Sequence, residues 1–166
     1  GHARAVNSVC ASPDGAHVVS GSQDSTACVW RLIDGGRARI LEGHSGPVNS
    51  VCVSPDGAHV VTASADRTAR IWALAGGALV RILSGHNDVV YGACVGLDGA
   101  LVITASDDMT ARVWRLCDGS LVRTLVGHSD TVLSVAVSPD GAQLATASRD
   151  GTACVWRLAD GAHLRT

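Results

Sequence analysis

The chain has 166 residues, of which 46% are hydrophobic and 17% charged, so it is too apolar to be disordered and long enough to bury a core. Its formal net charge of −2 leaves no electrostatic footprint for nucleic acid, and no apolar run approaches the roughly 18 to 20 residues of a transmembrane helix. We therefore expect partners other than nucleic acid or a membrane. The aromatic content is unusual, because the chain contains four Trp but one Tyr and no Phe.

The tryptophans mark an internal repeat. Trp30, Trp72 and Trp114 are each followed by another Trp 42 residues later, the last being Trp156. A Gly-His dipeptide, an Asp, a Thr and an Asp-Gly pair recur with the same step, without insertion or deletion. Repetition at this period is typical of propellers, solenoids and repeat arrays. The predicted units are residues 1–42, 43–84, 85–126 and 127–166.

The second unit shows the predicted elements in chain order. A strand is expected over 48–53, followed by a Ser-Pro-Asp-Gly turn in which Pro presets φ and Gly allows a positive φ. A second strand is expected over 59–63 and a tight turn at 65–67. A third strand over 68–74 is rich in residues that favour extended structure, and two glycines separate it from a fourth strand over 79–83. Four short antiparallel strands form a sheet that cannot bury both faces alone, so neighbouring units must stack.

These units resemble the WD-repeat β-propeller family in their length and in the spacing from Gly-His to Trp. The resemblance covers the whole chain, four times. One departure is consistent, since the Asp that usually follows the Trp is replaced by Arg in units 1, 3 and 4 and by Ala in unit 2. Because that Asp is variable in the family, the resemblance still implies an all-β fold, a β-propeller of four-stranded antiparallel blades with four blades per chain.

The resemblance also implies a structural hydrogen-bonded tetrad in each unit. It links the Trp of the third strand, a Ser or Thr of the second strand, the His before the first strand and the Asp of the tight turn. A buried Trp needs a partner for its indole N–H and a buried His needs partners for both ring nitrogens, so such groups can satisfy one another. The implied tetrads are Trp30–Ser20–His2–Asp24, Trp72–Thr62–His44–Asp66, Trp114–Thr104–His86–Asp108 and Trp156–Thr146–His128–Asp150.

The same residue types also occur in a catalytic triad of Ser or Thr, His and Asp. A catalytic site is normally asymmetric, whereas this set occurs four times with unchanged spacing, and three copies carry Thr in place of Ser. No phosphate-cradling glycine loop or nucleotide fingerprint is present. We therefore predict no catalytic residue, no cofactor and no enzymatic activity.

The cysteines show no ligand pattern. They fall at three repeat positions: Cys10, Cys52 and Cys94 at the first, Cys28 and Cys154 at the second, and Cys117 alone. The fourth unit has Ala136 at the first position, which indicates a small packing residue, and units 2 and 3 have Arg70 and Arg112 at the second. Without a Cys-x-x-Cys pair or Cys/His ligand spacing no metal site is predicted. Without a disulfide pattern a reducing, cytoplasmic localisation is expected.

Partners of this family usually bind the end of the propeller that carries the loops before the first strands and the turns between the second and third strands. The resemblance places three residues of each unit there: the third and fifth after the Gly-His histidine and the one before the tetrad Asp. These positions differ among the units, whereas the tetrads do not. The candidate partner-binding face is Ala5, Asn7, Gln23, Pro47, Asn49, Ala65, Val89, Tyr91, Asp107, Thr131, Leu133 and Arg149.

The composition of this face favours protein partners. Tyr and Arg are enriched at interface hot spots, and the face is neither strongly basic nor strongly acidic. We therefore expect a non-enzymatic protein–protein interaction scaffold that presents the face to protein or peptide partners. The alternative stays open that these are surface residues without a role, in a purely structural or assembly segment of a larger repeat protein.

Four blades raise a question of closure. Blades of this size usually form rings of about seven, and four would leave two apolar end faces bare. In one interpretation, two chains close head to tail into an eight-bladed ring, a homodimer through the terminal blades. The near-uniform repeats favour it, because a capped open array should show polar terminal repeats. In the other, the chain is a segment of a longer propeller, and the two are compatible because a segment can still dimerise.

Overall fold

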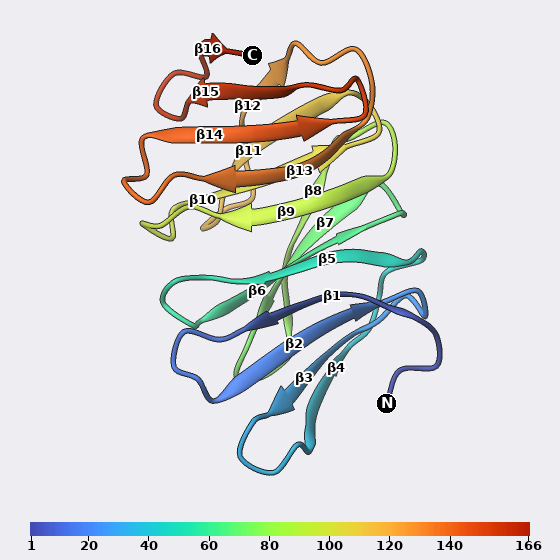
Figure 1. Cartoon of the computed structure of the whole chain (residues 1–166). Coiled ribbons are helices and arrows are strands. Elements are labelled where there is room, and N and C mark those ends of the chain that lie inside the picture. The colour runs from blue at the N-terminus through green and yellow to red at the C-terminus, as the bar shows by residue number, and fades with distance from the viewer.

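The computed structural model describes residues 1–166 and contains sixteen β-strands and no helix (Figure 1). The strands form four separate antiparallel sheets, each in chain order, which we number blades 1 to 4. Blade 1 contains β1 (Val6–Ala11), β2 (His17–Ser22), β3 (Ala27–Arg31) and β4 (Arg37–Leu41). Blade 2 contains β5 (Val48–Val53), β6 (His59–Ser64), β7 (Thr68–Ala73) and β8 (Leu79–Ser84). Blade 3 contains β9 (Val90–Val95), β10 (Leu101–Ser106), β11 (Thr110–Arg115) and β12 (Leu121–Val126). Blade 4 contains β13 (Val132–Val137), β14 (Gln143–Ser148), β15 (Ala153–Arg157) and β16 (His163–Arg165).

The prediction of an all-β chain built from four-stranded antiparallel blades is confirmed. In blade 2 the strand ends differ from the expected ones by a single residue. The third strand ends at Ala73, one residue earlier than expected, although the N–H of Leu74 still donates to its register partner, the carbonyl of Ala58, at 2.9 Å.

The turn between the first two strands of blade 2 is held by side chains as well as backbone. Gly57 has φ +70° and its N–H donates to the carbonyl of Ser54 at 2.8 Å. The Ser54 hydroxyl donates to the carboxylate of Asp56, and the N–H of His59 donates to the Ser54 oxygen at 2.9 Å. The backbone groups of this turn are therefore hydrogen-bonded within the turn itself. This local bonding lets Ser-Pro-Asp-Gly end one strand and begin the next.

The tight turn between the second and third strands contains a left-handed residue in every blade. The first three blades have Ser25 (φ 69°), Arg67 (φ 70°) and Met109 (φ 64°) at this position, and the fourth has Gly151 (φ 84°). Only glycine adopts this region without a steric cost from Cβ. Three of the four turns therefore store some backbone strain.

The core lies between consecutive blades, at contacts that we call seams. At each seam the forward face of one blade, which is turned toward the next blade, packs on the backward face of the next. The forward faces contribute Val19, Ala27, Val29 and Leu41 in blade 1, Val61, Ala63, Ala69, Ile71 and Leu83 in blade 2, and Ile103, Ala105, Ala111, Val113 and Leu125 in blade 3. The backward faces contribute Val48, Val51, Val60, Trp72 and Leu74 in blade 2, Val90, Ala93, Val102, Trp114 and Leu116 in blade 3, and Val132, Val135, Leu144, Cys154 and Trp156 in blade 4.

Alternation along the strands explains how one blade serves two seams. Val60 and Val61 are neighbours on β6, both are 0% exposed, and they belong to the seams on opposite sides of blade 2. Successive side chains of a strand point to opposite faces of the sheet, so a strand buried on both faces reads as a continuous apolar run. Figure 1 shows the four blades stacked with blades 1 and 4 at opposite ends.

Candidate functional site

The tetrad of blade 2 is a chain of hydrogen bonds from Trp72 to Asp66. The indole Nε1 of Trp72 donates to Thr62 Oγ1 at 2.9 Å, and Thr62 Oγ1 lies 2.7 Å from His44 Nε2. His44 Nδ1 lies 2.7 Å from Asp66 Oδ2. Because a carboxylate only accepts, Nδ1 carries the proton of the ring, and Nε2 accepts from the Thr62 hydroxyl. The chain therefore joins the third strand, the second strand, the loop before the first strand and the tight turn.

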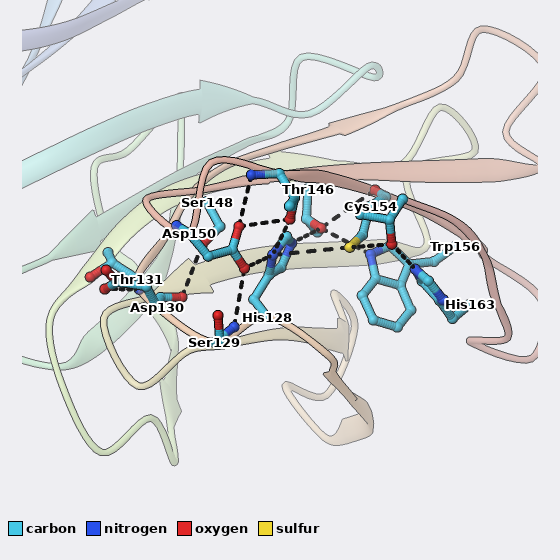
Figure 2. Close-up of polar contacts among 12 residues, drawn as sticks. His128, Ser129, Asp130, Thr131, Thr146, Ser148, Asp150, Cys154, Trp156 and His163 are labelled. Carbon is cyan, nitrogen blue, oxygen red and sulfur yellow. Dashed lines mark hydrogen bonds and ion pairs between the residues drawn. The ribbon is translucent and has the colours of Figure 1, made fainter.

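The other three blades repeat this geometry. The Trp Nε1 to hydroxyl distances are 2.8 Å for Trp30–Ser20, 2.9 Å for Trp114–Thr104 and 2.9 Å for Trp156–Thr146. The His Nε2 to hydroxyl distances are 2.7 Å for His2–Ser20, 2.8 Å for His86–Thr104 and 2.8 Å for His128–Thr146. The His Nδ1 to carboxylate distances are 2.9 Å for His2–Asp24, 2.7 Å for His86–Asp108 and 2.7 Å for His128–Asp150. Figure 2 shows the tetrad of blade 4, with His128 between Thr146 and Asp150.

The tetrad carboxylate also holds the tight turn. Asp66 Oδ1 accepts from the N–H of Thr68 at 3.0 Å and from its hydroxyl at 2.6 Å, and Oδ2 accepts from the N–H of Ser45 at 3.2 Å. Burial by itself would raise the pKa of Asp66, but the hydrogen bonds from His44 and Thr68 outweigh it and hold the pKa well below its usual range. The side chain is therefore ionised at neutral pH.

The tetrad hydroxyls have no access to a substrate. Thr62 and Thr104 are 0% exposed, Thr146 is 1% and Ser20 is 5% exposed. Each hydroxyl oxygen is already occupied by the indole N–H and by the His ring. A nucleophile must reach the atom that it attacks, so this arrangement fastens the blade and cannot act on a bound molecule.

Two arginines next to the tetrads were not predicted from the sequence as part of them. Arg70 Nη2 lies 3.8 Å from Asp66 Oδ2, and its guanidinium carbon lies 6.0 Å from the centre of the Trp72 ring. Arg112 Nη2 lies 3.9 Å from Asp108 Oδ2. The signal in the sequence was the presence of Arg in units 2 and 3 at a repeat position that holds Cys in units 1 and 4.

The cysteines at that position stand beside the outer tetrads. Cys28 Sγ lies 3.9 Å from His2 Nδ1, and Cys154 Sγ lies 4.0 Å from His128 Nδ1. Burial raises the pKa of the Cys28 thiol, so it is protonated and unreactive at neutral pH. All six cysteines are free. No group of three or more His, Cys, Asp or Glu side chains is arranged to hold a metal ion, and no helix is long and apolar enough to cross a membrane.

The candidate partner-binding face is built on one backbone hydrogen bond per blade. In each blade the residue before the tetrad Asp donates its N–H to the carbonyl of the third residue after the Gly-His histidine. The four pairs are Gln23–Ala5, Ala65–Pro47, Asp107–Val89 and Arg149–Thr131, all at 2.9 Å. Two of the three predicted positions in each blade are thereby held side by side.

The third predicted position divides the blades into two pairs. In blades 1 and 2 it holds Asn7 and Asn49, whose side-chain amides donate across the seam to the carbonyls of Val48 and Val90 at 3.0 Å. These amides tie the inner strands of neighbouring blades together. Tyr91 and Leu133 hold the same position in blades 3 and 4 and make no such bond. A shallow hollow of about 330 Å³ opens over the inner strands of blades 1 to 3, lined by Arg4, Asn7, Gln23, Pro47, Asn49, Ala65, Val89 and Tyr91.

The seam between blades 3 and 4 has its own contacts on this face. The guanidinium carbon of Arg149 lies 5.8 Å from the centre of the Tyr91 ring. The hydroxyl of Thr131 donates to Asp107 Oδ1, and Thr131 is only 2% exposed. Thr131 was predicted to be part of the exposed face, but it is a buried packing residue at this seam. Leu133 is 38% exposed.

Comparison with known proteins gives a matching sequence family and many similar solved structures. The sequence model described as "WD domain, G-beta repeat" matches residues 1–31, 35–73, 77–115 and 119–157. No curated protein matches the chain. A solved structure described as "Structure of U3-55K" is similar with a TM-score of 0.92 and 26% sequence identity, over 99% of this chain and 52% of that chain. The present chain thus spans about half the length of that relative.

Proposed function

Because the chain belongs to the WD40 repeat family, we propose that it is a non-enzymatic scaffold that presents one face to a protein or peptide partner. The observation that carries this proposal is the group of Tyr91, Asp107, Leu133 and Arg149, which we call the Tyr91 patch. It lies on the candidate face, at the seam between blades 3 and 4.

The Tyr91 patch differs from the rest of the face in what its side chains do. In blades 1 and 2, Asn7 and Asn49 hold the neighbouring inner strand, so their amides have a structural task. Tyr91 and Leu133 stand at the same repeat position without such a bond. Arg149 is exposed and lies over the ring of Tyr91, so an aromatic ring and a cation stand together at the seam, and Leu133 is also exposed. Tyr and Arg are the anchors most often found at the centre of protein interfaces.

We propose no enzymatic activity, because the hydroxyls of the tetrads cannot reach a substrate. The four tetrads hold Ser or Thr, His and Asp in the order of a catalytic triad, but their hydroxyls are buried and occupied. We also propose that nucleic acid and membranes are not partners, on the support of the net charge of −2. A cytoplasmic location is proposed on the support of six free thiols.

The proposal includes assembly. We propose that two chains pair through their terminal blades and close an eight-bladed ring, so that two Tyr91 patches lie on the same assembly. The support is that a propeller removes its exposed sheet faces only by closing.

Affinity capture tests the scaffold proposal. The full chain is immobilised and proteins retained from a cell extract are compared for the native sequence, Tyr91→Ala and Arg149→Glu. We expect at least one protein to be retained by the native chain and reduced at least tenfold by both substitutions, since hot-spot side chains carry most of the binding energy. Arg115→Glu is the matched control, because Arg115 is exposed and lies at the end of β11 that is away from the candidate face.

The result that contradicts the proposal is equal retention of every protein by the native chain and both patch variants. The purely structural or assembly role would then be the better account of the chain.

A further inference from the structure

Blade 1 exposes a backward face that is buried in every other blade. Val9 is 66% exposed and Leu32 is 53% exposed, whereas their repeat counterparts in blade 2, Val51 and Leu74, are 5% and 7% exposed. Trp30 is half-buried, while the other three tryptophans are at most 3% exposed. This face has the same residue types as the backward faces that form the internal seams.

Blade 4 exposes the complementary forward face. Ala147 and Ala153 are exposed, whereas their counterparts Ala63 and Ala69 are 0% and 1% exposed. Ala145 is also exposed and stands at a position that is fully buried in the other blades. These central positions carry alanines and no charged side chain, so nothing at the centre of the face opposes burial against a second apolar sheet.

A hydrogen bond between inner strands accompanies the first two internal seams. The N–H of Val51 donates to Ser8 Oγ at 3.2 Å, and the N–H of Ala93 donates to Ser50 Oγ at 3.3 Å. Ser134 occupies the same repeat position in blade 4, where it is exposed and has no blade in front of it. Its counterpart donor in blade 1 is the N–H of Val9.

An arginine bond accompanies all three internal seams and runs from the fourth strand of one blade to the turn between the third and fourth strands of the next. Arg39 Nη2 donates to the carbonyl of Ala75 at 3.0 Å and Arg81 Nη2 to that of Cys117 at 3.3 Å. Arg123 Nη1 donates in the same way to the turn of blade 4, at the carbonyl of Leu158. Arg165 holds this repeat position in blade 4 and is exposed. Its counterpart acceptors are the carbonyls of residues 32–33 in blade 1.

We propose that the forward face of blade 4 docks on the backward face of blade 1 of a second copy of the chain, with Ser134 Oγ accepting from the N–H of Val9 and Arg165 donating to a carbonyl of residues 32–33. The proposal rests on the homodimer of the proposed function and specifies how it is built. It follows from continuity with the internal seams, because the two bare faces carry the two halves of the same contact. They stand at opposite ends of the stack, so the two faces of one copy of residues 1–166 do not meet, whereas the faces of two copies can (Figure 1). Head-to-tail contacts of this kind close a ring when the rotation fits.

Sedimentation of the full chain provides the first measurement. The proposal predicts a mass of 33.8 kDa, twice the 16.9 kDa of the chain, at micromolar concentration. A mass of 16.9 kDa at all concentrations up to the millimolar range would overturn both the homodimer and the docking contact. The scaffold role of the Tyr91 patch is judged separately, by the capture experiment.

Two charge variants then test the docking contact itself. Val9→Arg blocks the backward face of blade 1, and Ala147→Arg blocks the forward face of blade 4. Each variant alone should be monomeric, because every junction needs one face of each kind. An equimolar mixture should recover a 1:1 complex, since one intact face of each kind is then available. Val126→Arg is the matched control and should stay dimeric, because Val126 is 72% exposed at a position where the other blades have Glu42 and Ser84.

The remaining outcomes are also decisive. A native dimer that survives Val9→Arg and Ala147→Arg leaves the homodimer standing and overturns this contact, and so does a mixture that stays monomeric. If either arginine variant fails to fold, the double variant Ser134→Ala/Arg165→Ala replaces it, since both side chains are exposed in the single chain. It should weaken the dimer on the order of a hundred- to thousandfold, because both bonds are lost at each of the two junctions of the ring, and an unchanged dissociation constant contradicts the proposal.

Discussion

The guanidinium of Arg149 stacks on the ring of Tyr91, with 5.8 Å between the guanidinium carbon and the ring centre. This contact joins the tight turn of blade 4 to the inner strand of blade 3. At the other two seams the position of Tyr91 holds an asparagine, Asn7 or Asn49, whose amide instead joins the inner strands of the two blades. The third seam has therefore replaced a backbone-directed hydrogen bond by a contact between two side chains that also face solvent. Such a contact can be altered without breaking the strand pairing beneath it.

A double-mutant cycle measures the contribution of this contact. We expect Tyr91→Ala and Arg149→Ala to show a coupling of about 0.5–1 kcal/mol in the free energy of unfolding, because an exposed cation–π pair contributes that much. Urea denaturation of the native chain, the two single variants and the double variant supplies the four values. Additive effects within about 0.3 kcal/mol would show that the two side chains do not interact in solution.

The tetrads should contribute strongly to stability. Thr62→Val keeps the shape of the side chain and removes the hydroxyl that serves both Trp72 and His44. We expect a loss of about 3 kcal/mol in the free energy of unfolding, because a buried N–H and a buried ring nitrogen both lose their partner. Thr124→Val, at an exposed position of β12, is the control and should change it by less than about 0.5 kcal/mol. Equal effects of the two substitutions would contradict a fastening role.

The strained turns offer a stabilising change. Met109 has φ 64° and is 48% exposed, so its side chain contributes little packing to offset the strain. Met109→Gly should raise the free energy of unfolding by about 1 kcal/mol, because glycine has no Cβ to crowd the left-handed conformation. Met109→Ala keeps the Cβ and should not reproduce the gain. If both variants behave alike in thermal denaturation, strain at this turn is not the cause.

The sequence predicted the architecture because its signals repeat. Four copies of the same spacing place the turn, the Trp and the Gly-His loop independently of any one local preference, and the strands were found within one residue of the expected ends in blade 2. The burial of Thr131 was not predictable in this way. It depends on a hydrogen bond to Asp107 in the neighbouring blade, which is a contact across a seam and not a property of the repeat.

The same limit applies to the arginines beside the tetrads. The approach of Arg70 to Asp66 depends on how the side chain folds back over the Trp72 ring. Spacing along the chain shows that this position holds Arg in the two inner units and Cys in the two outer ones, but not where the guanidinium lies. Side-chain contacts that are absent from some repeats require the structure.

Acid should destabilise the chain in two steps. Burial lowers the pKa of His86 below its ordinary value of 6.5, against the opposing effect of Asp108. Burial alone would raise the pKa of Asp108, but hydrogen bonds from Thr110 and His86 hold it below its ordinary 3.8. In both cases the unfolded chain binds protons more readily than the folded chain, so stability falls as pH falls.

The pH windows follow from these two directions. The loss from His86 begins as the pH drops below about 6.5, and the loss from Asp108 begins below about 3.8. Urea midpoints at about pH 7.5, 5.5 and 3.5 should therefore decrease in that order. A midpoint that is constant or higher at about pH 5.5 would contradict a neutral, buried His86.

Amide hydrogen exchange of the full chain, with and without the partner retained in the capture experiment, tests the central claim most directly. The partner should slow exchange in the turns that carry Asp107 and Arg149 and at the beginnings of β9 and β13, which carry Tyr91 and Leu133. No change is expected at the Ser-Pro-Asp-Gly turn of blade 2 at the opposite end. Slowed exchange at that turn or along the outer strands β8 and β12, with the four patch positions unaffected, would contradict it.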